Sequence, residues 1–118
     1  MLTIYGLKNC DTCRKARSWL KEQGIDHEFH DVRADGITVT DVQRWANAAG
    51  WEKLLNRRGT TWRGLSDTDK EAVDEAKAVS LMSENPALIK RPVFEQAGKV
   101  VVGFTADDQQ DVSRLVDG

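Results

Sequence analysis

Two cysteines, Cys10 and Cys13, are the side chains in this sequence best suited to nucleophilic chemistry, and two residues separate them. A cysteine thiolate is a strong nucleophile that exchanges readily with disulfides. Residues three apart in a helical turn have Cβ atoms about 5–6 Å apart, so a modest adjustment brings such a pair into disulfide geometry. The spacing therefore favours thiol chemistry in which Cys10 attacks and Cys13 resolves the product.

The elements on either side of the cysteines are predicted to place them at the start of a helix. Residues 2–5 alternate between apolar and polar positions, which predicts a strand, and Gly6 permits a turn after it. From Cys13 onward the apolar positions have helical spacing, and Gly24 is a suitable residue to end the helix. Cys10 should then lie just ahead of the helix and Cys13 in its first turn.

The helix start favours an ionised Cys10, but its dipole alone is too weak. Lowering a thiol pKa from about 8.5 to about 6.5 requires roughly 2.7 kcal/mol, whereas the helix dipole supplies roughly 0.3–1 kcal/mol. Backbone amides of the loop can donate to the sulfur, and cations near it in sequence can add to the effect. Those cations are Lys8, Arg14, Lys15 and Arg17.

Two other interpretations of the cysteines compete with the redox one. Cys13 lies on the same helical stripe as Ala16 and Leu20, so it can also serve only as a small buried hydrophobe. A zinc site with His27 and His30 has roughly suitable spacing. However, these histidines lie in a predicted strand, where positions three apart face opposite sides. We therefore expect no metal site.

Composition indicates an ordinary globular protein of one domain. The chain has 118 residues, of which 40% are hydrophobic and 31% charged, with a net charge of −2. It contains no apolar run long enough to span a membrane, and no signal peptide is expected because Met1 leads directly into a strand. These features predict a cytoplasmic protein without attraction for membranes or nucleic acid.

The remaining pattern predicts an α/β domain with a helical insertion. A strand at 26–32 and a turn at 33–36 are followed by a capping-box helix from Thr38 to Gly50, with an apolar face that begins at Val39. Residues 51–65 are irregular, and a helix capped by Ser66 carries apolar residues to position 79. Leu81 and Met82 either continue this helix or start a second short one, which Asn85-Pro86 must end. A hairpin and a final helix capped by Thr105 complete the chain. The expected fold is thioredoxin-like, βαβ then ββα, over residues 1–118, with the insertion at 37–89.

The chain also resembles the arsenate reductase (ArsC) family, within it the YffB group, whose relatives include the Spx regulators. The matching motifs span nearly the whole chain, at residues 3–5, 8–12, 50–51, 54–56, 58–63 and 89–93. The resemblance implies a thioredoxin-like fold with a helical insertion and a nucleophilic cysteine at Cys10.

The resemblance also implies anion-binding arginines at Arg58 and Arg91 and a cis peptide between Arg91 and Pro92. A planar guanidinium matches an oxyanion or a carboxylate bidentately, which suits both arsenate and glutathione. Arg57 adjoins Arg58, so either can be the binding arginine. Lys8, Asn9 and Pro92 are further candidates for the same anion site.

Two departures from the family pattern bear on the substrate. Arsenate reductases have a histidine four residues before the nucleophile, where this chain has Gly6, and an arginine near Gly103 that is missing here. Losing one guanidinium contact to a small oxyanion removes about 1.5–3 kcal/mol, or roughly ten- to a hundredfold in affinity. A thiol-disulfide reaction needs only the thiolate, an anion-binding groove and access.

The sequence therefore predicts a monomeric oxidoreductase, a reductase that uses glutathione or another thiol as cosubstrate and has no tightly bound cofactor. Its substrate would be a disulfide or a small oxyanion. Two alternatives stay open: an arsenate reductase proper, and a Spx-like redox-sensing regulator that binds RNA polymerase.

Overall fold

The computed structural model describes residues 1–117, so Gly118, the last residue of the predicted domain, lies outside the described residues. The chain forms two compact units. One comprises Met1–Gly36 and the chain from Arg91 onward, and the other comprises Ile37–Lys90. Among residues 1–117, no helix combines the length and the hydropathy that crossing a bilayer requires.

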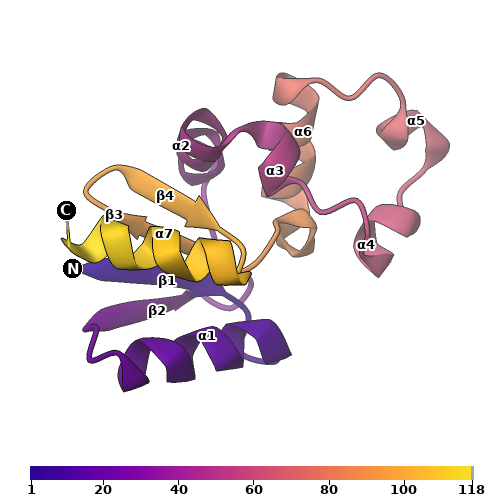
Figure 1. Ribbon diagram of the computed structural model, residues 1–118. Helices are drawn as coiled ribbons and strands as arrows, with labels where there is room; N and C mark the ends of the chain where they lie inside the picture. Colours follow the sequence, from indigo (N-terminus) through magenta and orange to yellow (C-terminus); the bar gives the residue numbers. More distant parts are fainter. Residues whose placement is uncertain (118) are drawn as a thin grey trace. The chain divides into compact units, whose positions relative to one another are not determined.

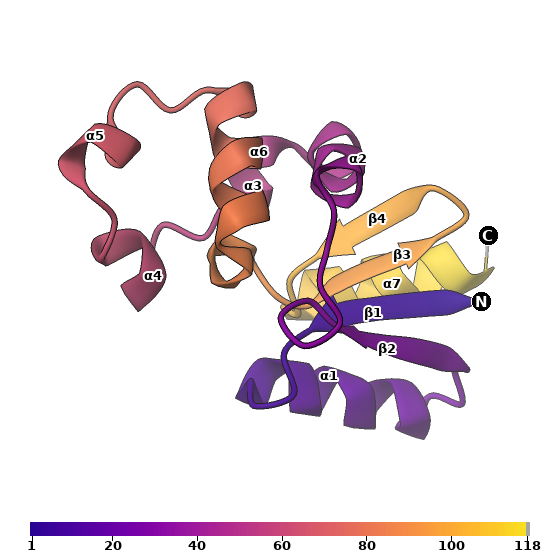
Figure 2. The same cartoon turned by 180° about the vertical axis from the view of Figure 1, so that it is seen from behind.

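The first unit is a four-stranded mixed sheet with two helices (Figures 1 and 2). The strand order is β2-β1-β3-β4, with β1 and β2 parallel and the other two pairs antiparallel. The order of elements confirms the predicted α/β plan of βαβ followed by ββα. The elements are β1 (Leu2–Gly6), α1 (Asp11–Glu22), β2 (His27–Asp31), β3 (Val93–Gln96), β4 (Lys99–Val102) and α7 (Ala106–Asp117).

A hydrophobic cluster joins both helices of this unit to one face of its sheet. Leu2 and Ile4 alternate along β1 and so point to the same face. Residues of α1 and α7 belong to the same cluster, so the two helices cover that face together. The fully or nearly fully buried members are Leu2, Ile4, Ala16, Leu20, Phe94, Val112 and Leu115.

The second unit is helical. Its helices α2, α3 and α6 pack against one another, and an isolated antiparallel bridge joins Leu55 to Ile89. The elements are α2 (Val39–Ala49), α3 (Trp51–Leu54), α4 (Thr60–Arg63), α5 (Asp67–Lys70), α6 (Glu75–Glu84) and a 3-10 turn, η1 (Pro86–Leu88).

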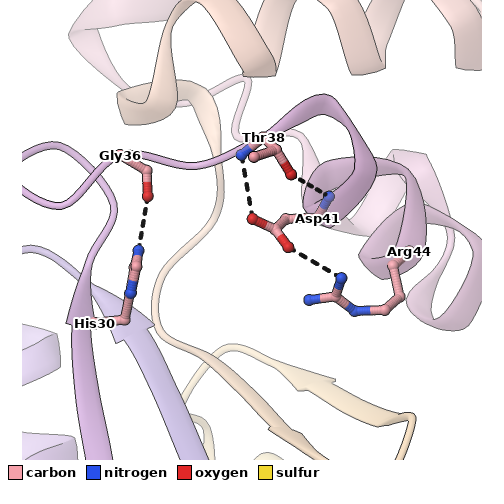
Figure 3. A network of polar contacts seen from close by, with 5 residues as sticks. All are labelled: His30, Gly36, Thr38, Asp41 and Arg44. Atoms are coloured by element: carbon pink, nitrogen blue, oxygen red, sulfur yellow. Dashed lines mark hydrogen bonds and ion pairs between the residues drawn. The ribbon is translucent and has the colours of Figure 1, made fainter.

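The predicted capping box at the start of α2 is present. The Thr38 hydroxyl accepts the Asp41 N–H at 3.1 Å, and the Asp41 carboxylate accepts the Thr38 N–H at 3.1 Å and an Arg44 N–H at 3.0 Å (Figure 3). The helix ends at Gly50 as predicted. The prediction that the apolar face of this helix begins at Val39 was wrong, because Val39 is 60% exposed. At the first helical position its side chain does not join the buried stripe of Val42 and Trp45.

The predicted helix from Ser66 to position 79 was also wrong, because the chain breaks it into α5 and α6. Ser66 caps α5 as predicted, but this helix ends after one turn, and Ala72 adopts a left-handed φ of 47°. Asp74 then caps α6 by accepting the Lys77 N–H at 2.9 Å. The Lys77 ammonium donates to the carbonyl oxygens of Thr68, at 2.7 Å, and Glu71, at 2.5 Å, which stabilises the break.

Candidate active site

Cys10 is the N-cap residue of α1, and Cys13 lies in the first turn, as predicted. The Cys10 N–H donates to the Leu7 carbonyl at 3.2 Å, which closes a tight turn, and the Cys10 carbonyl accepts the first helical hydrogen bond from Arg14 at 2.9 Å. Both sulfurs are free thiols, but Cys10 is partly exposed whereas Cys13 is fully buried. Only Cys10 is therefore directly accessible to a reagent in solution.

The surroundings of Cys10 favour its thiolate. Burial by itself raises the pKa of this thiol. Hydrogen bonds from the Cys13 N–H, the Cys13 thiol and the Arg91 guanidinium, together with the charge of Arg91, lower the pKa by a larger amount. The net effect is a pKa below the ordinary value for cysteine. Cys10 thus combines exposure with a lowered pKa, and both favour a nucleophile.

The surroundings of Cys13 favour its neutral thiol. Burial is the largest cause, and the neighbouring Cys10 adds to it, so that the pKa of Cys13 is raised to about 11 despite a hydrogen bond from the Leu7 N–H and the charge of Arg91. At pH 7 a thiol with this pKa is ionised in about one molecule in 10,000. The two sulfurs therefore have opposite tendencies: Cys10 accepts a hydrogen bond and Cys13 donates it.

Gly6 makes room for the second cysteine. A Cβ atom at position 6 would lie 2.5 Å from the Cys13 sulfur and 3.3 Å from its Cβ atom, which is too close for any side chain. The backbone of β1 consequently approaches the first turn of α1 in a way that only glycine permits. Glycine at position 6, where arsenate reductases have histidine, is thus sterically linked to the presence of Cys13.

Cys10 opens onto a pocket of about 630 Å³ in the first unit. Four of the residues predicted for the site line it, namely Lys8, Asn9, Cys10 and Arg91. The Arg91-Pro92 peptide is cis, as the resemblance implies, and Pro92 itself is buried, with its carbonyl accepting the Gly103 N–H at 2.9 Å. The other lining residues are Leu7, Asp31, Arg33 and Ala34.

Asp31, at the end of β2, holds the cysteine loop in place. It is only 5% exposed, and its carboxylate accepts the backbone N–H groups of Lys8 at 3.0 Å, Arg33 at 2.9 Å and Ala34 at 2.8 Å. The Ala34 hydrogen bond is the largest influence on the Asp31 pKa; burial raises it, but the Lys8 and Arg33 hydrogen bonds and the Lys8 charge leave it lowered overall.

Replacing Asp31 with asparagine is expected to destabilise the protein at pH 7 by about 1–3 kcal/mol, because an amide nitrogen cannot accept N–H groups that are buried with it. A carboxyl whose pKa is depressed on folding stabilises the fold above its unfolded pKa, near 3.9, and loses this contribution as the pH falls through the folded value. Denaturant titrations of parent and variant should thus diverge at pH 7 and begin to converge only as the pH falls below about 4, toward the lowered pKa of folded Asp31. A difference independent of pH would contradict this account.

Sequence reasoning missed Asp31 and Arg33 as site residues. It assigned 33–36 only as a turn, although an aspartate directly before a turn often accepts the backbone N–H groups two and three residues ahead. That local signal was available in the sequence. The contact to Lys8, 23 residues away, was not.

Arg58 lies in the second unit with Arg57, and the two differ in their contacts there. The Arg57 guanidinium lies 5.5 Å from the ring centroid of Trp51 and 5.8 Å from that of Trp62. The Arg58 side chain is exposed, and its backbone N–H and carbonyl are held by Asn56 at 3.0 Å and Arg63 at 3.0 Å. These contacts give Arg57 a structural role, whereas the anion-binding role of Arg58 stays a prediction.

We expect the two arginines to respond differently to alanine substitution. Arg57→Ala removes two cation-π contacts and should lower the free energy of unfolding by about 1 kcal/mol. Arg58→Ala should leave stability within about 0.5 kcal/mol, because it is an exposed position, and instead raise the KM for an anionic substrate. Thermal unfolding and steady-state kinetics of both variants check this. A raised KM in Arg57→Ala alone would reverse the assignment.

The family model for the ArsC family matches residues 5–112 of the chain. An uncharacterized protein of Haemophilus influenzae is 44% identical over 110 residues, covering 93% of this chain and 96% of its own length. The Global transcriptional regulator Spx of Staphylococcus saprophyticus is 24% identical over 110 residues, covering 92% of this chain and 83% of its own.

Two solved structures are similar over almost the entire chain. The YffB protein is 45% identical with a TM-score of 0.89, covering 94% of this chain and 97% of its own. An arsenate reductase (ArsC) related protein from Brucella melitensis is 44% identical with a TM-score of 0.77, and the match covers 96% of this chain and 94% of that protein. The similarity thus extends over both compact units.

Proposed function

Since the chain belongs to the ArsC family, we propose that it is a thiol-dependent reductase that uses glutathione as its reductant and Cys10 as its nucleophile. The observation that supports this most is the environment of Cys10. It is a partly exposed thiol whose pKa is lowered by Arg91 and by the start of α1, and it opens onto a pocket with three cationic residues. Such a site suits attack on an anionic disulfide.

In the proposed reaction the Cys10 thiolate attacks one sulfur of a mixed disulfide of glutathione. The new bond joins Cys10 to the glutathione sulfur, the old sulfur-sulfur bond breaks, and the substrate leaves as a thiolate that takes a proton from water. A second glutathione thiolate then attacks the adduct, forms glutathione disulfide and restores the Cys10 thiolate. The substrate sulfur is reduced to a thiol, and one free glutathione is consumed, because it ends in glutathione disulfide together with the glutathione of the mixed disulfide.

Cys13 offers an internal route for the second step, but burial opposes it. Forming the Cys10–Cys13 bond would need the Cys13 proton to move to the departing glutathione thiolate, and the pKa of Cys13 is about 11 while Cys10 is ionised. Once Cys10 carries the adduct its charge is gone, but burial, the largest cause of the raised Cys13 pKa, remains. We therefore assign the main route to glutathione from solution and a slower route to Cys13.

Reduction of arsenate is the second candidate, favoured by solved relatives whose descriptions are "arsenate reductase (ArsC) related protein" and "possible arsenate reductase". For this reaction the Cys10 site would have to hold a small tetrahedral oxyanion with few contacts. In place of the family's histidine stands Gly6, where the Cys13 sulfur leaves no room for a side chain. This is the reason we rank disulfide reduction first.

The two candidates are separated by one assay. The parent protein is mixed with glutathione and either a glutathione mixed disulfide of a small thiol or arsenate, and the glutathione disulfide produced is measured. We expect turnover with the mixed disulfide and none above background with arsenate. Turnover with arsenate alone would favour the second candidate, and no turnover with either would contradict both.

A further inference from the structure

Lys8 and Arg33 lie on two separate loops that line the pocket of Cys10. We propose that these two cations form a carboxylate-binding subsite beside Cys10, in addition to Arg91, and that this subsite selects a thiol cosubstrate carrying carboxylates over a neutral one. The identity of the ligand as a thiol cosubstrate rests on the proposed function. The existence of the subsite rests on the pocket.

One buried carboxylate fixes both loops. Asp31 accepts the backbone N–H of Lys8 at 3.0 Å with one oxygen and that of Arg33 at 2.9 Å with the other. Two exposed cations that are far apart in the sequence are thereby anchored through their backbones to a single side chain. Such anchoring reduces the conformational entropy that a ligand-binding pair loses when it binds.

The balance of charge in the pocket favours an anion. Lys8, Arg33 and Arg91 line it, and Asp31 is the one acidic residue among its lining side chains. The Asp31 charge is offset by three backbone N–H donors, and only 5% of the residue is exposed. The cations are consequently the charges that a ligand in the pocket meets.

The size of the pocket suits a peptide-sized ligand. Its volume of about 630 Å³ lies within the range of about 300–1,000 Å³ for sites that bind drug-sized molecules. A tetrahedral oxyanion has only five heavy atoms and would leave most of this space to water. A small peptide thiol with two carboxylates can place its sulfur at Cys10 while its carboxylates reach cations at separate points of the rim.

Alkylation of Cys10 tests the subsite without any catalytic turnover. Iodoacetate and iodoacetamide react with the same thiolate but differ in charge, so the ratio of their rates reports the positive potential where the iodoacetate carboxylate lies, in the pocket beside the sulfur. The pH midpoint with iodoacetamide reports the pKa of the thiol. At low ionic strength we expect Arg33→Ala to lower this ratio about two- to fivefold. Arg33→Glu should lower it further. The iodoacetamide midpoint should move less than in Arg91→Gln, because Cys13 and Arg91 are the groups that lower the Cys10 pKa.

Lys15→Ala is the matched control. Lys15 is an exposed cation in the first turns of α1, close to Cys10 in sequence but absent from the pocket lining. Its substitution should leave the ratio unchanged. An unchanged ratio in both Arg33 variants, or an equal fall in Lys15→Ala, would overturn the subsite.

The ligand class is tested by comparing glutathione with 2-mercaptoethanol as reductant. Arg33→Ala should raise the KM for glutathione about two- to fivefold and leave that for the neutral thiol unchanged. Equal effects on both thiols would overturn the selectivity. If the parent showed no turnover at all, the proposed function would fail while the alkylation ratio would still decide whether the subsite exists.

Discussion

Replacing Cys10 with serine is expected to reduce glutathione-dependent turnover by at least about 1,000-fold, to the rate without protein. A serine hydroxyl is not ionised near neutrality, so the positive helix end and Arg91 cannot convert it into a nucleophile. Losing the attacking atom of a covalent mechanism removes the reaction path itself, which is why such substitutions have the largest effects known for single residues. The measurement is the production of glutathione disulfide with a glutathione mixed disulfide as substrate.

Cys13→Ala is the matched control for this experiment. It removes the internal resolving thiol and one hydrogen bond to Cys10, but it keeps the backbone N–H of residue 13. We expect turnover to fall by less than about tenfold, since glutathione from solution can resolve the adduct. Turnover by Cys10→Ser at more than a few per cent of the parent rate would show that another group attacks. A loss in Cys13→Ala as large as that in Cys10→Ser would make the internal disulfide obligatory.

Arg91→Gln should produce the second largest effect, a fall in turnover of about ten- to a hundredfold at pH 7. The guanidinium donates a charge-assisted hydrogen bond to the Cys10 sulfur, and such bonds are worth about 1.5–3 kcal/mol. Because Arg91 lowers the Cys10 pKa, its removal raises that pKa. The midpoint of the pH dependence of alkylation should therefore move to higher pH, and part of the lost activity should return as the pH increases.

Arg91→Lys separates the charge of this residue from its geometry. An ammonium keeps the positive charge but presents its donors from a single point, whereas the guanidinium presents a planar fork. The alkylation midpoint should return most of the way to that of the parent, and the KM for glutathione should stay raised. An unchanged midpoint in Arg91→Gln would show that Arg91 does not act on Cys10, and the ionisation would have to come from the helix start and Cys13 alone.

Local patterns in the sequence were sufficient for most of the elements. The alternation of β1, the helical spacing after Cys13 and the capping boxes at Thr38 and Thr105 each depend on residues a few positions apart, and each has its predicted counterpart in the structure. The break between α5 and α6 was missed because Asp74 competes with Ser66 as a helix cap. The lysine that stabilises the break, Lys77, contacts carbonyl groups six and nine residues away.

The sequence by itself determined that Cys10 begins a helix and that a second cysteine follows in the first turn, because capping, periodicity and spacing are local properties. The helix start also favoured Cys10 as the thiol that ionises, but the tertiary structure decided how the surroundings of the two sulfurs differ. Burial raises the pKa of Cys13, whereas Arg91, 81 residues further along the chain, lowers that of Cys10. Only folding sets how much water and which distant charges surround a sulfur. The same holds for the contacts of Asp31 with Lys8 and of Gly6 with Cys13, which join segments whose proximity no local pattern encodes.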